Sequence, residues 1–330
     1  MPEILDLPVQ HTTRSPVFVI GAARSGTSIL CTLLRRYLAI SFGTESQFIT
    51  RIYRTLPHYG NLRHDANLRR LVDDVAKSRC FERWTRRFGC TVDADLAYER
   101  AASGTRSFAG VLDAFFGQLA DHHQMPRWGD KTPEYNFNLP VLLSLFPAAQ
   151  FVHIVRDGRD VALSGFRMHF GAGNAYRAAL QWRRTMLHVG HFCATLPPSQ
   201  VCTLHYETLL REPADTLGDL ARFLGIANTD AILPAIAEDV PSQVRSENGG
   251  KWRTAMSLQD QRLYESVAGD ELRAAGYPTP HGVERRIGPM ERAYWEAHHL
   301  VRKALRKHHW SDTLYRAGLR WRTVAVLGRD

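Results

Sequence analysis

The 330-residue sequence contains few cysteines, no long apolar run and no repeated or low-complexity block. Its five cysteines are odd in number and form no C-x-x-C pair, which indicates reduced thiols and a cytoplasmic location. No apolar run approaches the ~18–20 residues of a membrane span. The polar segment 1–15 has no apolar h-region, so no signal peptide is expected.

The composition is that of an ordinary globular protein with an excess of positive charge. The chain is long enough for one large α/β domain or two smaller ones. The formal net charge is +9, and residues 281–330 hold 11 Arg and Lys against 5 Asp and Glu. This balance suits an anionic substrate, an anionic membrane surface or nucleic acid.

One stretch, GAARSGTS from Gly21 to Ser28, organises the chain. It follows the β-branched run 17–20 and opens an apolar-periodic segment at Ile29. A strand, a glycine-bounded loop and a helix start in this order predict a phosphate-binding turn, because backbone N–H groups at the start of a helix point towards an anion. The alternative is a simple glycine turn.

The loop lacks the lysine of a nucleotide-binding P-loop, G-x-x-x-x-G-K-[ST]. Gly21 and Gly26 have the right spacing, but Thr27 and Ser28 follow directly. That lysine would reach the β- and γ-phosphates, and the next hydroxyl would hold Mg²⁺. Here Arg24 inside the loop supplies the cation. The loop therefore suits one 5′-phosphate with an attached group better than a metal-bound triphosphate.

Strand and helix patterns alternate along the rest of the chain. Strands are expected at 17–20, 127–131, 150–155 and 201–205, with a short extended piece or turn at 40–45, helices between the strands and a helical insertion at about 48–124. Thr132 and Asp160 are expected to cap the helices that follow them. This order predicts an α/β fold: a P-loop-like, three-layer parallel sheet flanked by helices. We expect one domain over 1–280 and a basic helical C-terminal extension over 281–330.

Ligands bind beyond the carboxyl ends of the strands in such sheets. The rule brings Lys131, Arg156 and Tyr206 to the same rim as the first loop. In IVRDGRDVALS, Arg156 and Ser164 lie at a strand–turn–helix junction that suits a second phosphate, or the charges form a surface ion-pair cluster. The basic segment 245–253, RSENGGKWR, could close over a nucleotide. Arginines are frequent in the insertion, either on a solvated face or in a substrate-binding wall.

Five motifs together resemble one family. RSGTS, Asp-Lys-Thr-Pro at 130–133, VRDGRDVALS at 155–164, HYETLL at 205–210 and GGKWR at 249–253 are similar to sulfotransferases that use 3′-phosphoadenosine 5′-phosphosulfate (PAPS). The branch is the one with arginine in the first loop, which includes tyrosylprotein sulfotransferases and many bacterial members. The resemblance covers roughly 17–252.

The resemblance implies a role for each motif. The loop residues would hold the 5′-phosphosulfate: Arg24, Ser25, Gly26, Thr27 and Ser28. Arg156 and Ser164 would bind the 3′-phosphate, with Ser246 and Lys251 closing over it, and Tyr206 would lie near the adenosine. Glu45 matches the catalytic base and Lys131 a cation near the transferred group, and Glu134 or His123 would be the next bases to examine.

The chemistry agrees with these roles. Sulfuryl transfer needs positioned groups and neutralisation of the charge that builds on the bridging oxygen, which Arg24 and Lys131 could supply without a metal. An acceptor hydroxyl must lose a proton, so a carboxylate such as Glu45 fits as the base. Two alternatives stay open: a P-loop-like nucleotide kinase, and a non-catalytic nucleotide- or polyanion-binding protein.

The partners are less defined. The acceptor could be a small molecule, a carbohydrate, a glycolipid or a peptide, and basic residues in the insertion favour an acidic one. No nucleic acid is expected. A helix is expected at 290–307, with Tyr294, His298, Val301 and Leu305 on one stripe. A weak contact between 290–322 and an anionic membrane is one interpretation, and a helix packed on the domain is the other.

Overall fold

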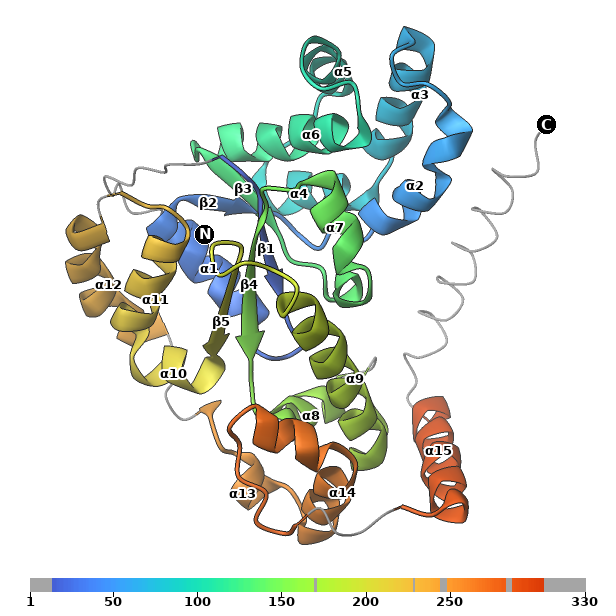
Figure 1. Cartoon of the computed structure of the whole chain (residues 1–330), viewed down its shortest axis with the longest axis vertical. Helices are drawn as coiled ribbons and strands as arrows, with labels where there is room; N and C mark the ends of the chain where they lie inside the picture. Colours follow the sequence, from blue (N-terminus) through green and yellow to red (C-terminus); the bar gives the residue numbers. More distant parts are fainter. Residues whose placement is uncertain (1–13, 169–170, 228, 244–247, 283–286, 306–330) are drawn as a thin grey trace. The chain divides into compact units, whose positions relative to one another are not determined.

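The computed structural model describes residues 14–168, 171–227, 229–243, 248–282 and 287–305. The chain divides into two compact units (Figure 1): Met1–Arg156 with Thr185–Gly249, and Asp157–Arg184 with Gly250–Asp330. Each unit has a buried apolar cluster of its own. The domain boundary expected at residue 280 stays a prediction.

The first unit is built on a five-stranded parallel sheet with the strand order β2-β3-β1-β4-β5. The four expected strands are present: β1 (Val17–Ile20), β3 (Arg127–Asp130), β4 (Gln150–Val155) and β5 (Val201–His205). The segment expected as an extended piece or a turn contains the fifth strand, β2 (Ile40–Phe42). After β1 the chain crosses to the β2 edge, and after β4 it goes to β5 on the other side. The point between β1 and β4 is therefore the switch point of the sheet, where ligands bind in such folds.

The sheet is the middle of three layers, because both of its faces are covered. Alternate residues of β1 enter different clusters, as the period of a strand requires. Val17 and Val19 pack with α1 (Thr27–Leu38), α10 (Tyr206–Arg211), α11 (Pro213–Phe223) and α12 (Thr229–Gln243). Phe18 and Ile20 pack with the insertion and with the end of α9 (Ala175–Cys193). The predicted three-layer α/β fold is confirmed.

The predicted helical insertion lies between β2 and β3. It contains α2 (Ile49–Thr55), a 3₁₀ turn η1 (Leu56–Tyr59), α3 (Asp65–Ala76), α4 (Arg79–Phe88), α5 (Ala94–Ser103) and α6 (Phe108–His122). Its centre is aromatic: the Phe81 ring lies 4.9 Å from that of Trp84 and 5.0 Å from that of Phe115. The side chains of Asp93 and Ser107 cap the N-termini of α5 and α6, because each accepts a hydrogen bond from a backbone N–H group of the first turn.

The helical stretches that follow β3 and β5 are each divided. A 3₁₀ turn, η2 (Pro133–Phe137), precedes α7 (Leu139–Leu145), and Asn138 between them has a φ of −142°. The second stretch breaks at Glu212, with φ −132° and ψ 61°, between α10 and α11. Pro213 explains this break, because a proline disfavours the helical conformation of the residue before it.

The second unit contains α8 (Gly158–Phe166), the start of α9, α13 (Trp252–Ala255), α14 (Leu258–Ala274) and α15 (Pro289–Ala304). The apolar stripe expected on α15 is exposed: Tyr294 is 60%, Val301 57% and Leu305 77% accessible. The helix is held from another side, where His299 Nδ1 accepts a hydrogen bond from the backbone of Gly173 over 2.9 Å.

Among the described residues, no helix is both long enough and apolar enough to cross a membrane. The membrane contact expected through 290–322 stays a prediction, and its last part, from residue 306, lies outside the described residues.

Candidate active site

The loop between β1 and α1 leaves the start of the helix open to an anion. Gly26 is the N-cap residue, with a left-handed φ of 94°, and within the described residues no side chain caps the helix. No acidic residue occupies the first turn. The Ser25 side chain is fully buried, and its Oγ has no hydrogen-bond partner in the described part of the chain. A helix start of this kind attracts negative charge.

Residues that directly follow β4 and β5 contact this loop. A Cβ atom on Gly26 would lie 2.4 Å from Cδ2 of Tyr206, so only glycine fits there. The Arg156 guanidinium lies 4.4 Å from the centre of the Tyr206 ring. Arg156 also donates hydrogen bonds to the backbone carbonyls of Arg24, over 3.1 Å, and Asn248, over 2.6 Å. The structure thus brings together Arg24, Gly26, Arg156 and Tyr206.

Asn136 fixes the first glycine of the loop. Its side-chain oxygen accepts a hydrogen bond from Gly21 N over 3.2 Å, and its side-chain nitrogen donates one to Gly21 O over 2.7 Å. A Cβ atom on Gly21 would lie 2.4 Å from the carbonyl oxygen of Ile154. Sequence reasoning missed Asn136, because it lies 115 positions away from its partner.

Glu45 and Lys131 form an ion pair. Lys131 Nζ lies 2.6 Å from Glu45 Oε1. The Lys131 side chain is 16% exposed and the Glu45 side chain is 36% exposed. Gln47 Nε2 donates a hydrogen bond to Glu45 Oε2 over 3.3 Å. Arg83 of α4 holds the backbone carbonyl of Glu45 over 2.6 Å. Two residues that the sequence proposed as a base and a cation are therefore in direct contact.

A buried hydrogen-bond network lies directly behind this pair. Asp130 Oδ2 accepts hydrogen bonds from Ser46 Oγ over 2.9 Å and from Thr132 Oγ1 over 3.1 Å. Ser46 Oγ also lies 2.7 Å from the hydroxyl of Tyr135. Because Ser46 follows Glu45 and Asp130 precedes Lys131, this network ties together the two loops that carry the pair.

The network also affects the ionisation of Asp130 and the hydrogen bonds of Thr132. Burial raises the pKa of Asp130 to about 6, although the hydrogen bonds from Ser46 and Thr132 and the charge of Lys131 act in the opposite direction. Thr132 does not cap the following turn with its side chain, because its Oγ1 is used by Asp130 and accepts a hydrogen bond from Ser46 N over 3.0 Å. Thr132 is the N-cap residue of η2, as expected, but its side chain does not supply the cap.

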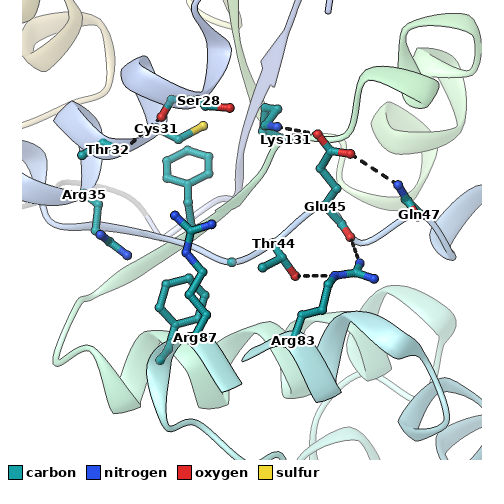
Figure 2. A pocket seen from close by; sticks show the side chains of 13 residues that line it. Ser28, Cys31, Thr32, Arg35, Thr44, Glu45, Gln47, Arg83, Arg87 and Lys131 are labelled. Atoms are coloured by element: carbon teal, nitrogen blue, oxygen red, sulfur yellow. Dashed lines mark hydrogen bonds and ion pairs between the residues drawn. The ribbon is translucent and has the colours of Figure 1, made fainter. Parts of the chain in front are cut away.

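The Glu45–Lys131 pair lies in the wall of a cavity of about 390 Å³. Figure 2 shows the side chains around it, which come from α1, from the end of β2 and the segment after it, from α4 and from the end of β3. Burial raises the pKa of the Cys31 thiol in this wall to about 12, so the thiol is uncharged. The lining residues are Ser28, Cys31, Thr32, Arg35, Phe42, Gly43, Thr44, Glu45, Gln47, Arg83, Arg87, Phe88 and Lys131.

The two alternative bases lie elsewhere. Glu134 is exposed on the 3₁₀ turn η2 and does not line the cavity. His123 is buried, its Nδ1 lies 2.8 Å from Ser41 Oγ, and burial lowers its pKa to about 4. Of the carboxylates and imidazoles considered from the sequence, Glu45 is the one in the cavity wall.

The second unit contains two further residues expected at the site, Ser164 and Lys251. The N-cap of α8 is Asp157, whose carboxylate accepts a hydrogen bond from Arg159 N, so the expectation for Asp160 is wrong. Asp160 instead accepts hydrogen bonds from the backbone nitrogens of Gly250, over 2.6 Å, and Trp252, over 2.8 Å. The residue between these two is Lys251, so its backbone is fixed to the helix that carries Ser164.

The charges of this segment do not form a surface cluster. Arg159 is fully buried, pairs with Asp157 over 2.8 Å and with Glu265 over 2.7 Å, and its guanidinium lies 3.4 Å from the centre of the Trp252 ring. The surface ion-pair alternative is therefore wrong. Ser246, the other residue expected to close over a 3′-phosphate, lies outside the described residues.

Comparison with known proteins places these features in one family. The model of the sulfotransferase family matches residues 16–230. A protein-tyrosine sulfotransferase of Drosophila melanogaster is 24% identical over 66% of this chain and 39% of its own length. An omega-hydroxy-beta-dihydromenaquinone-9 sulfotransferase of Mycobacterium bovis is 28% identical over 33% of this chain and 31% of its own length.

The fold has a solved counterpart. The sulfotransferase domain from the curacin biosynthetic pathway has a TM-score of 0.50 and 17% identity, over 81% of this chain and 100% of that domain. The curated relatives are longer: the chain spans about a third to a half of the length of those it matches first.

Proposed function

Because the chain belongs to the sulfotransferase family, we propose that it transfers the sulfuryl group of PAPS to a hydroxyl or amine of an acceptor. Membership of the family confirms the resemblance that the sequence motifs indicated, and with it the expected class of transferase. The fold expected from the sequence is the fold of that family.

One observation carries the proposal. The Glu45–Lys131 ion pair of 2.6 Å lies in the wall of a cavity that Ser28, at the end of the phosphate-binding loop, also lines. The proposed base, the proposed cation and the start of α1 therefore line one cavity. In-line transfer between two oxygen atoms requires this combination.

The proposed step is a single displacement at sulfur. The acceptor oxygen forms a bond to sulfur while the bond between sulfur and the bridging oxygen of PAPS breaks, and that oxygen keeps the electron pair. Glu45 takes the proton of the acceptor hydroxyl. A carboxylate has about four acceptor positions, so its contacts with Lys131 and Gln47 leave room for this hydroxyl. Lys131 and Arg24 stabilise the charge that develops on the leaving oxygen.

The first unit carries the proposed contacts with the 5′-phosphosulfate of the donor: the N–H groups of residues 24–28 and the buried hydroxyl of Ser25 suit this group. Arg156 and Tyr206 lie beside this loop, and from the resemblance we assign Arg156 to the 3′-phosphate and Tyr206 to the adenosine. In the second unit, we assign Ser164 of α8 and Lys251 to the 3′-phosphate, and the hydrogen bonds that Asp160 accepts from Gly250 N and Trp252 N hold the backbone at Lys251 against α8. We assign Ser246 to the same role from the resemblance alone.

The proposal includes a reaction without a metal, since two cations are available for the developing charge. The cytoplasmic location stays a prediction from the cysteine content. The relatives are named for acceptors as different as protein tyrosine and a dihydromenaquinone, so their names do not define an acceptor for this chain.

A binding experiment tests the donor. Adenosine 3′,5′-bisphosphate (PAP) should raise the Tm of the protein, and ATP with Mg²⁺ should raise it much less, because the loop has no lysine for the β- and γ-phosphates. The opposite order would favour the nucleotide kinase alternative.

A substitution tests the base. Glu45→Gln should lower kcat for sulfuryl transfer from PAPS by at least about 10²-fold, with PAP affinity nearly unchanged. Glu82→Gln on α4 is the matched control, because Glu82 is exposed and does not line the cavity. Near-normal turnover in Glu45→Gln, or loss of turnover in Glu134→Gln instead, would refute the assignment of Glu45. A chain that binds PAP and transfers nothing in any variant would be a non-catalytic binding protein.

A further inference from the structure

We propose that the cavity is built for an acceptor that carries an anionic group beside the reacting hydroxyl, and that Arg35 and Arg87 bind this anion. The inference rests on the proposed function for the identity of the acceptor. The anion site itself can be measured without any transfer reaction.

The wall of the cavity carries an excess of positive charge. Four of its described side chains are cationic, Arg35, Arg83, Arg87 and Lys131, and one is a carboxylate, Glu45. Lys131 is paired with that carboxylate. Arg83 donates to the Glu45 carbonyl and to Thr44 Oγ1.

The remaining two arginines are not neutralised. Within the described residues, neither Arg35 nor Arg87 forms an ion pair or a hydrogen bond through its side chain, although ion pairs are frequent elsewhere on the insertion, such as that between Arg69 and Asp95. Figure 2 shows Arg87 extending from α4 towards the side of α1 on which Arg35 lies. Two unpaired guanidinium groups in one cavity wall are a suitable site for an oxyanion.

Phe88 keeps the two arginines together. Its ring is buried, and the guanidinium carbons of Arg35 and Arg87 each lie 5.6 Å from its centre. Burial and the nearby charge of Arg87 both lower the pKa of Arg35. The two like charges therefore repel each other when the site is empty, and a bound anion would remove this repulsion.

The size of the cavity agrees with a small anionic acceptor. About 390 Å³ is enough for a ring or sugar unit with one acidic substituent. A carboxylate, a sulfate ester and a phosphate ester share the chemistry that two guanidinium groups recognise. The competing occupant is the phosphosulfate of the donor, since Ser28 lines the same cavity.

Calorimetry with matched probes tests the proposal. The full chain, with and without saturating PAP, is titrated with 4-hydroxyphenylacetate and its amide, with glucuronate and glucuronamide, and with 4-hydroxyphenyl phosphate and phenol. At least one acid should bind about 10-fold more tightly than its neutral partner, which corresponds to about 1.4 kcal/mol. The three pairs distinguish a carboxylate on a ring, a carboxylate on a sugar and a phosphate ester.

Three variants locate the site. Arg35→Gln and Arg87→Gln should each reduce the preference for the acid to less than about 3-fold while PAP affinity stays the same. Arg86→Gln is the control, because Arg86 is the exposed neighbour on the same helix and does not line the cavity. It should keep the full preference. The side chains of Arg35 and Arg87 are not core residues, so a normal Tm is expected in both variants.

Several results would overturn the inference. One is that no acid binds better than its neutral partner, including the case in which none binds. Another is a preference that survives both substitutions. A third is that the substitutions weaken PAP as much as the acids, which would assign the arginines to the donor. Absence of sulfuryl transfer with an intact preference would refute the proposed function and leave the anion site in place.

Discussion

Replacement of Ser46 by alanine tests whether the buried network positions the Glu45–Lys131 pair. Ser46 Oγ is 2.9 Å from Asp130 Oδ2 and 2.7 Å from the Tyr135 hydroxyl. The substitution leaves both of these buried groups with one hydrogen bond fewer. Such a loss costs about 1–3 kcal/mol. In a domain of this size it lowers the Tm by roughly 3–10 °C.

The substitution should also lower the rate of catalysis. Without the Ser46 hydroxyl, the loop that carries Glu45 is no longer tied through this side chain to the strand end that carries Lys131. A displacement of about 1 Å at a reacting group can lower the rate about 10²-fold. We expect kcat for sulfuryl transfer to fall by about 10- to 100-fold. KM for PAPS should change by less than about 3-fold, because the hydrogen-bond partners of Ser46 lie outside the phosphate-binding loop.

The structure offers a closely matched control. Ser41 is also fully buried, and its Oγ lies 2.8 Å from His123 Nδ1 beneath the sheet. Ser41→Ala should lower the Tm to a similar degree and leave kcat within about 2-fold. Ser46→Thr, which keeps the hydroxyl, should restore activity. If Ser46→Ala and Ser41→Ala lower the Tm equally and both retain full kcat, the network holds the fold and does not position the pair.

Two further predictions concern the loop and the buried carboxylate. Gly26→Ala, with φ at 94° and the Tyr206 ring 2.4 Å from the new Cβ, should weaken PAP binding in calorimetry at least about 10-fold, whereas Gly89→Ala, with φ at 74° and open space around it, should leave PAP affinity unchanged. Burial raises the pKa of Asp130 from 3.8 to about 6, so its protonated form is favoured in the folded state and its contribution to stability falls as the pH rises from about 4 to 6. In urea unfolding at several pH values, the free energy of unfolding of the wild type minus that of Asp130→Asn should therefore fall by about 2–3 kcal/mol between pH 4 and 7, and a constant difference would contradict the raised pKa.

The sheet and its rim were predictable because they depend on local patterns. All five strands are short runs with β-branched or aromatic residues, and the order of strands and helices allows few topologies. That topology places the residues after β1, β3 and β4 at one rim. Lys131 could therefore be expected at that rim before any distance was known, and Glu45, placed by the resemblance, proved to be its partner.

The parts that sequence reasoning missed depend on partners far apart in the chain. Asn136 reaches Gly21 over 115 positions, and Asp130 reaches Ser46 over 84. No local sequence pattern around Asn136 or Asp130 predicts its hydrogen-bond partner. The position of Asp130 beside Lys131 was the available signal, since a buried acid next to a proposed catalytic cation requires a hydrogen-bond partner. On α15 a local pattern was misleading. The apolar residues recur at helical spacing, which is typical of a buried face, but this face is exposed, and the hydrogen bond of His299 with Gly173 holds the helix from another side.

The missing P-loop lysine is explained by where this chain places its cations. A P-loop lysine would lie on the first helix, beside the phosphates. Here Lys131 approaches from the end of β3 and forms an ion pair with Glu45, so in the proposed reaction one cation would serve both the base and the leaving oxygen. The loop follows β1 and Lys131 follows β3, so both are positioned by the sheet. Arg83, Arg87 and Phe88 instead lie on α4 of the insertion. Substitutions of Arg87 or Phe88 should consequently change which acceptor binds and leave PAP affinity intact in calorimetry, because neither residue belongs to the proposed donor site.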